Sequence, residues 1–393
     1  MHLSLFLWAN LAWAGDPVPA ESPPPSAPLD APPPDSPPPE SPTFTPEELE
    51  ALLRDAEAAV ADTPPPPPQA PARASFNAFN PGLTAFGDIV GQLGASPDGV
   101  ASGSTLYVRA VELELRADVD PFAKADAVIS FEQEAPPIEG GAGEGFGAEP
   151  EEAYVDLVSM PAHLSLRIGK FRAPFGIVNR VHNHDLPWVD RPAAAAALGD
   201  EGIVDTGASL GWIIPMGPAA LTLTAGAFSG DGFDETNERA NLATLGRAEL
   251  FAGFRTLDVA LGASVVADAG EGGFTDPEAD SAPTTGADLT IRWRPNPRRS
   301  VLLAAEGFRD PAGDLSGYAS LQVQPGRNTY VGVREDILST GLVHNLFATY
   351  YTSEFLRVRV GGGYAPTTQT GTALAQLTFV WGSHPVEPWW VNK

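Results

Sequence analysis

The chain lacks cysteine, has few basic residues, and has no long apolar run after its N-terminus. With no cysteine in 393 residues, it has no disulfide framework, thiolate zinc site or cysteine nucleophile. The 23 Lys and Arg are outnumbered by 50 Asp and Glu, which gives a formal net charge of −27. This balance argues against nucleic-acid binding, because such proteins need a basic face. No apolar stretch of about 20 residues follows the N-terminus, which excludes a transmembrane helix there. A membrane β-barrel remains compatible with the composition, since its strands alternate apolar and polar residues.

An export signal and a proline-rich spacer are predicted at the N-terminus. Residues 3–14 form a short apolar core that ends in small residues, which predicts a signal peptide over 1–14. Twenty of the 41 prolines lie between residues 15 and 72. Such a stretch lacks backbone donors and stays extended as polyproline II. We therefore expect residues 15–78 to be a disordered, Pro-rich periplasmic arm.

One short helix is expected within this arm. Thr45 can cap the helix, Pro46 suits its first position, and Glu48 completes a capping box. Apolar residues follow at helical spacing until a proline run begins at Pro64, which predicts a helix over 45–62. Because an isolated helix of this length is marginal, it either pairs in a short coiled coil or is mostly unfolded.

The rest of the chain alternates apolar and polar residues with a period of two, as half-buried strands do. In the clearest case, three apolar residues alternate with Arg357 and Arg359 across 356–360. About 16 such segments recur, beginning near residues 82, 104, 121, 152, 162, 204, 219, 242, 256, 285, 299, 316, 328, 343, 355 and 371.

The connections between these segments alternate in kind. One set is short, near residues 120, 160, 216, 255, 296, 325 and 353. The other set is mostly long and polar, at 93–103, 133–151, 173–203, 229–241, 267–284, 309–315, 336–343 and 365–371. Short periplasmic turns alternating with longer outer loops are typical of an up-and-down outer-membrane barrel with an even strand number. We therefore predict an all-β fold, a transmembrane antiparallel up-and-down β-barrel of about 16 strands over 79–384, followed by a C-terminal tail over 385–393.

A soluble β-sandwich or β-helix is the alternative fold. A sandwich needs no systematic alternation of short and long connections, and one long soluble sheet would have edges to protect. A closed barrel has no edges and pairs every backbone donor, as lipid requires. The pattern of connections therefore favours the barrel, with both termini on the periplasmic side.

Charged side chains on the strands should face the lumen, because Arg or Lys on the lipid side costs about 2–4 kcal/mol near the midplane. A ring of about 16 strands leaves a water-filled channel, so we expect a polar lumen. The strand residues expected to line it are Glu112, Glu114, Arg116, Arg167, Arg292, Arg294, Arg334, Arg357 and Arg359. Acids on the early strands and arginines on the later ones would set up a transverse electric field across the pore. Alternatively, these charges pair and merely fill the barrel.

The longest connection, 173–203, begins with the most specific motif of the chain. Residues 169–176 read Gly-Lys-Phe-Arg-Ala-Pro-Phe-Gly, and the pattern Gly-Lys-Phe-x-x-Pro-Phe-Gly resembles the phosphate-selective porin group. The block 151–205 is also similar to barrel-only proteins labelled zinc-regulated TonB-dependent outer membrane receptor. That block shares a Glu-Glu-Ala-Tyr strand, a Leu-x-Leu-Arg-x-Gly-Lys-Phe strand and an Asn–His–His–Asp–Pro loop.

The resemblance implies that the third outer loop folds into the lumen and narrows it. Residues 173–203 occupy this position in the chain. The loop residues expected to line the constriction are Arg180, His182, His184, Asp185, Asp190 and Arg191. A TonB-dependent receptor also needs an N-terminal plug, and only the Pro-rich arm precedes the first strand here, so we do not expect energised import.

Two further motifs could carry chemistry. His182 and His184, with Asp185 and Asp190 nearby, could bind a divalent metal ion, because imidazole and carboxylate are suitable ligands. Alternatively, the two histidines hydrogen-bond within a polar loop. The Gly-x-Ser-x-Gly sequence around Ser209 matches a nucleophile elbow, but that motif needs a helix directly after it, and a strand continues here. We therefore expect no enzyme.

The sequence as a whole predicts an outer-membrane, porin-like channel for passive diffusion of small hydrophilic solutes or ions, constricted by loop 173–203. No cofactor and no nucleic-acid partner are expected. The expected partners are outer-membrane lipid and lipopolysaccharide, the solute itself, and copies of the same chain in a trimer. The alternatives are a barrel-anchored surface structural or adhesion protein, or a metal-linked outer-membrane receptor without a plug domain.

Overall fold

The computed structural model describes the greater part of the chain after residue 80. The described residues are 81–97, 99–100, 104–133, 147–198, 202–230, 232, 242–268, 283–296 and 298–382. The predicted signal peptide over 1–14, the arm over 15–78 with its helix over 45–62, and the tail over 385–393 lie outside them.

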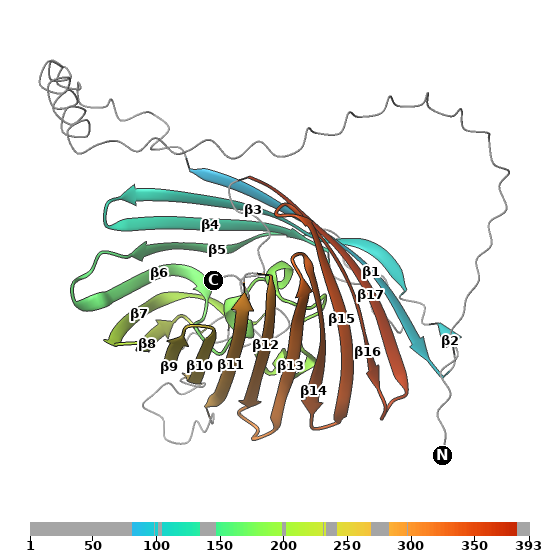
Figure 1. Ribbon diagram of the computed structural model, residues 1–393. Coiled ribbons are helices and arrows are strands. Elements are labelled where there is room, and N and C mark those ends of the chain that lie inside the picture. Colours follow the sequence, from blue (N-terminus) through green and yellow to red (C-terminus); the bar gives the residue numbers. More distant parts are fainter. Residues whose placement is uncertain are drawn as a thin grey trace, which may run out of the picture. The chain divides into compact units, whose positions relative to one another are not determined.

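The strands form one antiparallel sheet that closes on itself (Figure 1). They are β1 (Gly82–Ser96), β2 (Gly99–Val100), β3 (Thr105–Asp120), β4 (Ala123–Glu132), β5 (Gly147–Leu157), β6 (Leu164–Arg172), β7 (Val204–Met216), β8 (Ala219–Phe228), β9 (Ala243–Phe254), β10 (Leu257–Asp268), β11 (Thr284–Asn296), β12 (Arg299–Arg309), β13 (Leu315–Gly326), β14 (Thr329–Leu338), β15 (Gly341–Ser353), β16 (Leu356–Ala365) and β17 (Thr370–Gly382). Each strand of the wall pairs with the next along the chain, and β1 pairs with β17. Apart from the two-residue β2, which extends the β1 hairpin, the wall is a closed barrel of 16 strands. The predicted fold class is confirmed.

Most strands begin within about two residues of the predicted positions, and two differences are informative. Strand β5 begins at Gly147 rather than near 152, because residues 147–150 pair with β4 across a register shift despite their polar sequence. The connection expected over 336–343 is only the turn between Leu338 and Gly341, because Asp336 lies on the wall rather than in a loop.

The two faces of the wall have opposite character. Large apolar side chains are exposed on its outer face, among them Leu106, Ile168, Leu210, Trp212, Leu261, Trp293, Leu303, Leu321, Val333, Leu346, Val358, Val360, Leu377 and Trp381. The alternate positions, such as Arg357, Arg359 and Thr378, point inward and are buried. An apolar outer belt around a polar inner face is what a lipid bilayer requires of a barrel wall. Among the described helices, none is long and apolar enough to cross a membrane.

Four short 3-10 helices lie wholly within the described residues. One, η2 (Pro161–His163), lies between β5 and β6, and the other three lie between β6 and β7. These three are η3 (Val178–Arg180), η4 (Asn183–Asp185) and η5 (Ala193–Leu198). We call the described residues of 173–203 the lumenal loop, because they lie inside the wall, as the green segment of Figure 1 shows.

The lumen is less polar than the sequence predicts. Phe175, Leu186 and Trp188 of the lumenal loop belong to a buried cluster with wall residues such as Tyr318 and Phe347. Trp188 packs edge-on against Tyr318, with ring centroids 5.2 Å apart. The expectation of a wide, polar lumen is therefore wrong for this part of the barrel. The apolar residues of the loop face the wall and exclude water there.

Candidate functional site

Two glycines of the 169–176 motif have positive φ angles, one within β6 and one at the start of the lumenal loop. Gly169 has φ +139°, and a Cβ at this position would collide with the backbone of β5 at Ala153. Gly176 has φ +55°, and a Cβ there would collide with the carboxylate of Glu306 on β12. Glycine adopts such backbone angles without the penalty that a side chain brings. The motif therefore places the start of the lumenal loop directly against β12.

Asn179 joins the two ends of the lumenal loop. Its Nδ2 donates to the carbonyl oxygens of Ala173, at 2.8 Å, and Ile203, at 3.1 Å. Its Oδ1 accepts from the backbone N–H of Ile203 at 2.7 Å. Asn179 is fully buried, so these bonds satisfy the side chain and fix the base of the loop.

Glu306 of β12 holds the first turn of the lumenal loop. Its Oε1 accepts from the backbone N–H of Ile177 at 2.9 Å, and its Oε2 accepts from that of Val178 at 3.2 Å. Next to it, Ser264 Oγ of β10 accepts from the backbone N–H of Gly176 at 3.1 Å. A typical intramolecular hydrogen bond contributes about 0.5–1.5 kcal/mol. Side chains of the wall thus supply the hydrogen-bond partners that an irregular buried backbone needs.

Arginines of the wall bind carbonyl oxygens in the middle of the loop. Arg359 of β16 donates to the carbonyl of Trp188 at 2.5 Å, and Arg109 of β3 donates to that of Val189 at 2.5 Å. Arg357 donates to the carbonyl of His184. These guanidinium groups are therefore occupied by the loop backbone.

The far part of the loop is held by β14. Arg334 Nη2 lies 2.9 Å from Asp190 Oδ2, and its Nε lies 2.9 Å from Asp336 Oδ1. The guanidinium carbon of Arg334 also stands 5.0 Å from the ring centroid of Trp188. Asp336 in turn accepts from the backbone N–H of Ala193 at 3.3 Å. Arg334 and Asp336 are each 1% exposed, so this ion-paired network is part of the packed interior.

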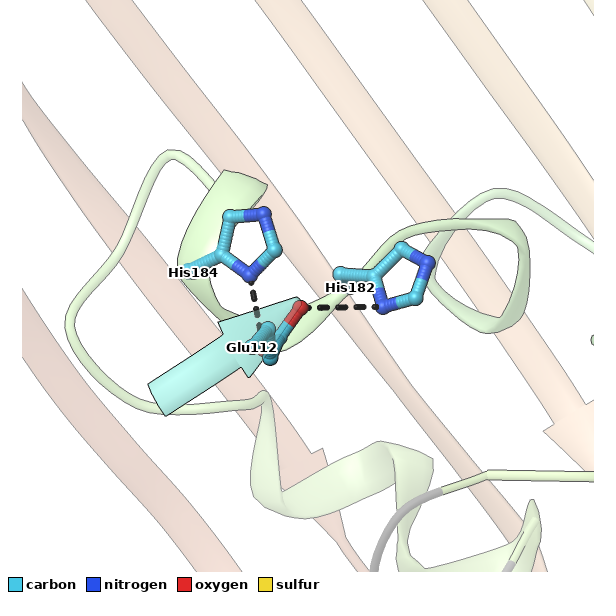
Figure 2. Close-up of side chains that lie close together, drawn as sticks. All are labelled: Glu112, His182 and His184. Carbon is cyan, nitrogen blue, oxygen red and sulfur yellow. Dashed lines mark hydrogen bonds and ion pairs between the residues drawn. The ribbon is translucent and has the colours of Figure 1, made fainter. Parts of the chain in front are cut away.

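On the opposite side of the lumen, a cluster of histidines and carboxylates joins the loop to β3 and β5. Figure 2 shows its part on β3, where Glu112 faces His182 and His184. His184 Nδ1 lies 2.9 Å from Glu112 Oε1, and His182 Nδ1 lies 3.7 Å from Glu112 Oε2. His182 Nδ1 is also 3.1 Å from Glu151 Oε1, and its Nε2 is 2.9 Å from Glu152 Oε2. The two imidazole rings stack with centroids 5.5 Å apart, although His184 lies in a 3-10 turn and not on an extended segment.

Both histidines have raised pKa values. Burial acts to lower the pKa of His182, but the attraction of Glu151 and hydrogen bonds to Glu151 and Glu152 raise it well above its ordinary value. Burial also acts to lower the pKa of His184, and the charges of Glu112 and Asp185 raise it on balance. Each ring therefore stays protonated to a higher pH than free histidine and forms charge-assisted hydrogen bonds with the wall.

A cavity of about 320 Å³ lies beside this cluster. Its lining residues come from β1, β3 to β6 and the lumenal loop, and they are Phe86, Glu112, Glu114, Arg116, Asp126, Val128, Glu152, Tyr154, Arg167, Arg172, Pro174, Arg180, His182, His184 and Asp185. A second cavity of about 350 Å³ is lined by the short-turn ends of β3, β4 and β5. Arg116, Asp126 and Tyr154 line both cavities. The space on this side of the lumen is therefore polar and charged.

The predicted site residues fall into two groups. Those that line the 320 Å³ cavity are Glu112, Glu114, Arg116, Arg167, Arg180, His182, His184 and Asp185. Those that do not line it are Asp190, Arg191, Arg292, Arg294, Arg334, Arg357 and Arg359. Of the second group, Arg191 donates to Asn183 at 3.4 Å, Arg292 pairs with Asp258 at 2.5 Å, and Arg294 is exposed near the end of β11.

Several residues that shape the site were absent from the predicted set. Glu306, Asp336 and Trp188 hold the loop, and Glu151 and Glu152 surround His182. The period-two pattern predicts that Glu306 faces the lumen, but it does not predict which groups Glu306 binds there. Glu151 and Glu152 belong to the block 151–205 that carries the family resemblance, but the resemblance implies no role for their side chains. Contacts between residues far apart in the sequence leave no local signal.

The comparisons of the sequence with known proteins assign no family to the chain. No protein-family model matches the chain. A protein of Aquifex aeolicus (strain VF5), described as "Uncharacterized protein", is 28% identical over 151 residues, which cover 36% of this chain and 29% of that protein. The match therefore spans less than a third of that relative's own length.

Two solved structures resemble the barrel. Salmonella typhi OmpF, in a complex with daunomycin, has a TM-score of 0.52 at 11% identity over 78% of this chain and 99% of that chain. Pseudomonas putida OprB, in a structure at high pH, has a TM-score of 0.51 at 10% identity over 78% of this chain and 95% of that chain. At such identities the likeness shows the fold alone, which is the fold of outer-membrane porins.

Proposed function

We propose that the chain is an outer-membrane, porin-like channel through which small hydrophilic solutes or ions diffuse passively. The observation that carries this proposal is the charged cavity beside β3 to β6, within a closed 16-strand barrel whose opposite side is packed. A pore of this kind selects by radius and by the charge of its lining. It needs no catalytic group.

The lumenal loop is the proposed constriction. Wall residues of β3, β5, β9, β10, β12, β13, β14 and β16 bind it. A loop held from so many strands would keep a fixed position in the lumen. The solute path would then run between the loop and the wall of β3 to β6, past the residues that line the cavity.

The charges along this path are mixed, which bears on the solute. Carboxylates such as Glu114 and Asp126 stand beside Arg116 and Arg167, so the path carries no ladder of one sign. Arg334, Arg357 and Arg359 would not attract a passing anion, because each is 1% exposed and bonded to neighbouring groups. The likeness to the phosphate-selective porin group therefore concerns the loop motif and not the charges along the path. We propose no phosphate selectivity.

The exposed apolar belt supports the proposed place in the outer membrane, where lipid and lipopolysaccharide would surround the wall. A trimer and a periplasmic N-terminal arm remain part of the proposal. The periplasmic position of the arm agrees with short turns on one side of the barrel and long connections on the other.

Planar-bilayer recording tests the proposal with two proteins: the full chain, and a variant in which residues 174–202 are replaced by a short Gly-Ser turn. We expect discrete conductance steps from the full chain and larger steps from the variant. If the barrel is only an anchor for a surface or adhesion protein, the pure, folded full chain will give no steps. Equal steps from both proteins would instead reject the loop as the constriction.

A further inference from the structure

The histidine–carboxylate cluster of Figure 2 has the ligand types and spacing of a transition-metal site. We propose that Glu112, His182 and His184 bind one divalent transition-metal ion, with Glu151 as a fourth ligand. The proposal concerns a binding site and does not depend on the channel function.

The ligand atoms are close to the positions that an ion would require. One donor atom each from Glu112, His182 and His184 lies within 4.8 Å of the others. The observed separations are 2.9 Å for His184 Nδ1 to Glu112 Oε1, 3.7 Å for His182 Nδ1 to Glu112 Oε2, and 3.1 Å for His182 Nδ1 to Glu151 Oε1. Tetrahedral zinc with bonds of about 2.0–2.1 Å places neighbouring ligand atoms about 3.3 Å apart. The observed separations therefore lie on both sides of the spacing that zinc requires, without any movement of the side chains.

The second nitrogen of each imidazole faces a carboxylate. Nε2 of His182 lies 2.9 Å from Glu152 Oε2, and Nε2 of His184 lies 3.5 Å from Asp185 Oδ1. Metal-bound histidines almost always donate their other ring N–H to such a partner, which fixes the tautomer and orients the ring. Both Nδ1 atoms are thus left to face Glu112, which is the arrangement that a shared ion needs.

The charge of the cluster suits a divalent cation. The groups around the two rings are the carboxylates of Glu112, Glu151, Glu152 and Asp185 and the guanidinium of Arg172, which pairs with Glu151. Four carboxylates around one guanidinium leave an excess of negative charge, which attracts a divalent cation.

Oε2 of Glu151 has no hydrogen bond, and the side chain is only 9% exposed. Buried polar atoms without a hydrogen bond are rare in folded proteins, and this one belongs to a proposed ligand. The 320 Å³ cavity reaches Glu112, His182 and His184, which gives a hydrated ion a route to the site.

The ligand set favours one class of metal. Imidazole nitrogen with carboxylate suits Zn²⁺, Cu²⁺ or Ni²⁺, whereas Ca²⁺ and Mg²⁺ prefer sites made only of oxygen. We therefore expect Zn²⁺ to bind and a similar concentration of Ca²⁺ not to displace it.

Isothermal titration of the full chain, folded in detergent and freed of metal with a chelator, tests this site with Zn²⁺ as the probe. We expect one saturable site per chain that is lost in His182→Ala and in Glu112→Gln. Glu152→Gln, which removes only an outer partner, should weaken binding by about 10–100-fold. His344→Ala is the matched control, because His344 pairs with Glu335 at 2.7 Å and is half exposed, away from the cluster. It should bind Zn²⁺ as the wild type does.

Circular dichroism and heat-dependent gel mobility show whether each variant has folded. Glu112→Gln keeps the size of the side chain, so it still tests the site if His182→Ala does not fold. No stoichiometric Zn²⁺ binding by the folded wild type would overturn the proposal. Wild-type binding by Glu112→Gln, or loss of the site in His344→Ala, would overturn it as well. Ion conductance is measured separately, so failure of the metal site leaves the channel proposal standing.

Discussion

The carboxylate of Glu306 lies 2.9 Å from the backbone nitrogen of Ile177, although 129 residues separate the two in the sequence. Glu306 is 3% exposed, so its carboxyl group is buried where the lumenal loop meets β12. The same carboxylate also accepts from Val178 at 3.2 Å. This wall side chain thus helps to hold the loop where it enters the lumen.

Glu306→Gln tests this relationship. Glutamine has nearly the same volume, but it offers one carbonyl oxygen and an NH₂ group in place of two acceptors. One backbone N–H would therefore lose its acceptor, at a cost of about 1–3 kcal/mol. We expect a lower free energy of unfolding in urea and more open-channel current noise. The control is Glu335→Gln, on an outward-facing pair with His344. Equal effects from both substitutions would contradict the assigned role.

Arg334→Met should destabilise the barrel more strongly. Methionine fills much of the same space but leaves Asp336, 1% exposed, without its ion-pair partner. Breaking a buried ion pair from one side costs about 3–5 kcal/mol. The unfolding temperature of the protein in detergent, monitored by its gel mobility, should fall. Arg298→Met, at an exposed turn position, should leave it unchanged. Similar behaviour of the two variants would mean that Arg334 does not hold the loop.

A pair of matched substitutions locates the solute path. Asp126 receives a hydrogen bond from Arg116 at 2.9 Å and lines the cavity, whereas Asp258 receives one from Arg292 at 2.9 Å and does not. Asp126→Asn removes a negative charge from the path and exposes the charge of Arg116. In a salt gradient, the reversal potential of Asp126→Asn should therefore shift toward anion preference. Asp258→Asn should shift it much less, and the opposite order would place the path elsewhere.

The alternation of residues was enough to predict the wall. Leu356 to Val360 and the other period-two segments predicted the strands, and the lengths of the connections predicted closure and the direction of the hairpins. For the lumenal loop, the length of the connection and the resemblance of the motif that ends at Gly176 predicted that it folds into the lumen, but not which wall residues hold it. Its contacts depend on which strands face each other across the lumen, and a sequence pattern does not contain that information.

The candidate site shows the same limit. His182 and His184 stood out because they are two residues apart, yet their partners Glu112 and Glu151 come from two different strands. The later arginines were expected to line a polar lumen, with pairing and filling of the barrel as the alternative. Arg359 instead is 1% exposed and bonds the carbonyl of Trp188, since the loop brings unpaired backbone groups that need donors.

The apolar belt gives a prediction that depends on depth in the bilayer. Val333 lies in the middle of β14, faces outward and is 50% exposed, whereas Leu315, 68% exposed, lies at the end of β13. Arginine on the lipid face costs about 2–4 kcal/mol at the midplane and about 0–1 kcal/mol near the interface. Val333→Arg should therefore reduce the free energy of folding into lipid vesicles far more than Leu315→Arg. Equal losses would argue that the wall does not span a bilayer in this register.

Cysteine accessibility is the most direct test of the central claim, that solutes pass between the lumenal loop and β3 to β6. The chain has no cysteine, so single-cysteine variants react at one place and the wild type is an unreactive control. Arg116 lines both cavities with its side chain 52% exposed, whereas Thr349, 3% exposed, lies on the packed side and accepts from Arg359 at 3.1 Å. A charged thiol reagent should lower the single-channel current of Arg116→Cys and leave that of Thr349→Cys unchanged. An unchanged current in Arg116→Cys, or a block confined to Thr349→Cys, would contradict this account of the path.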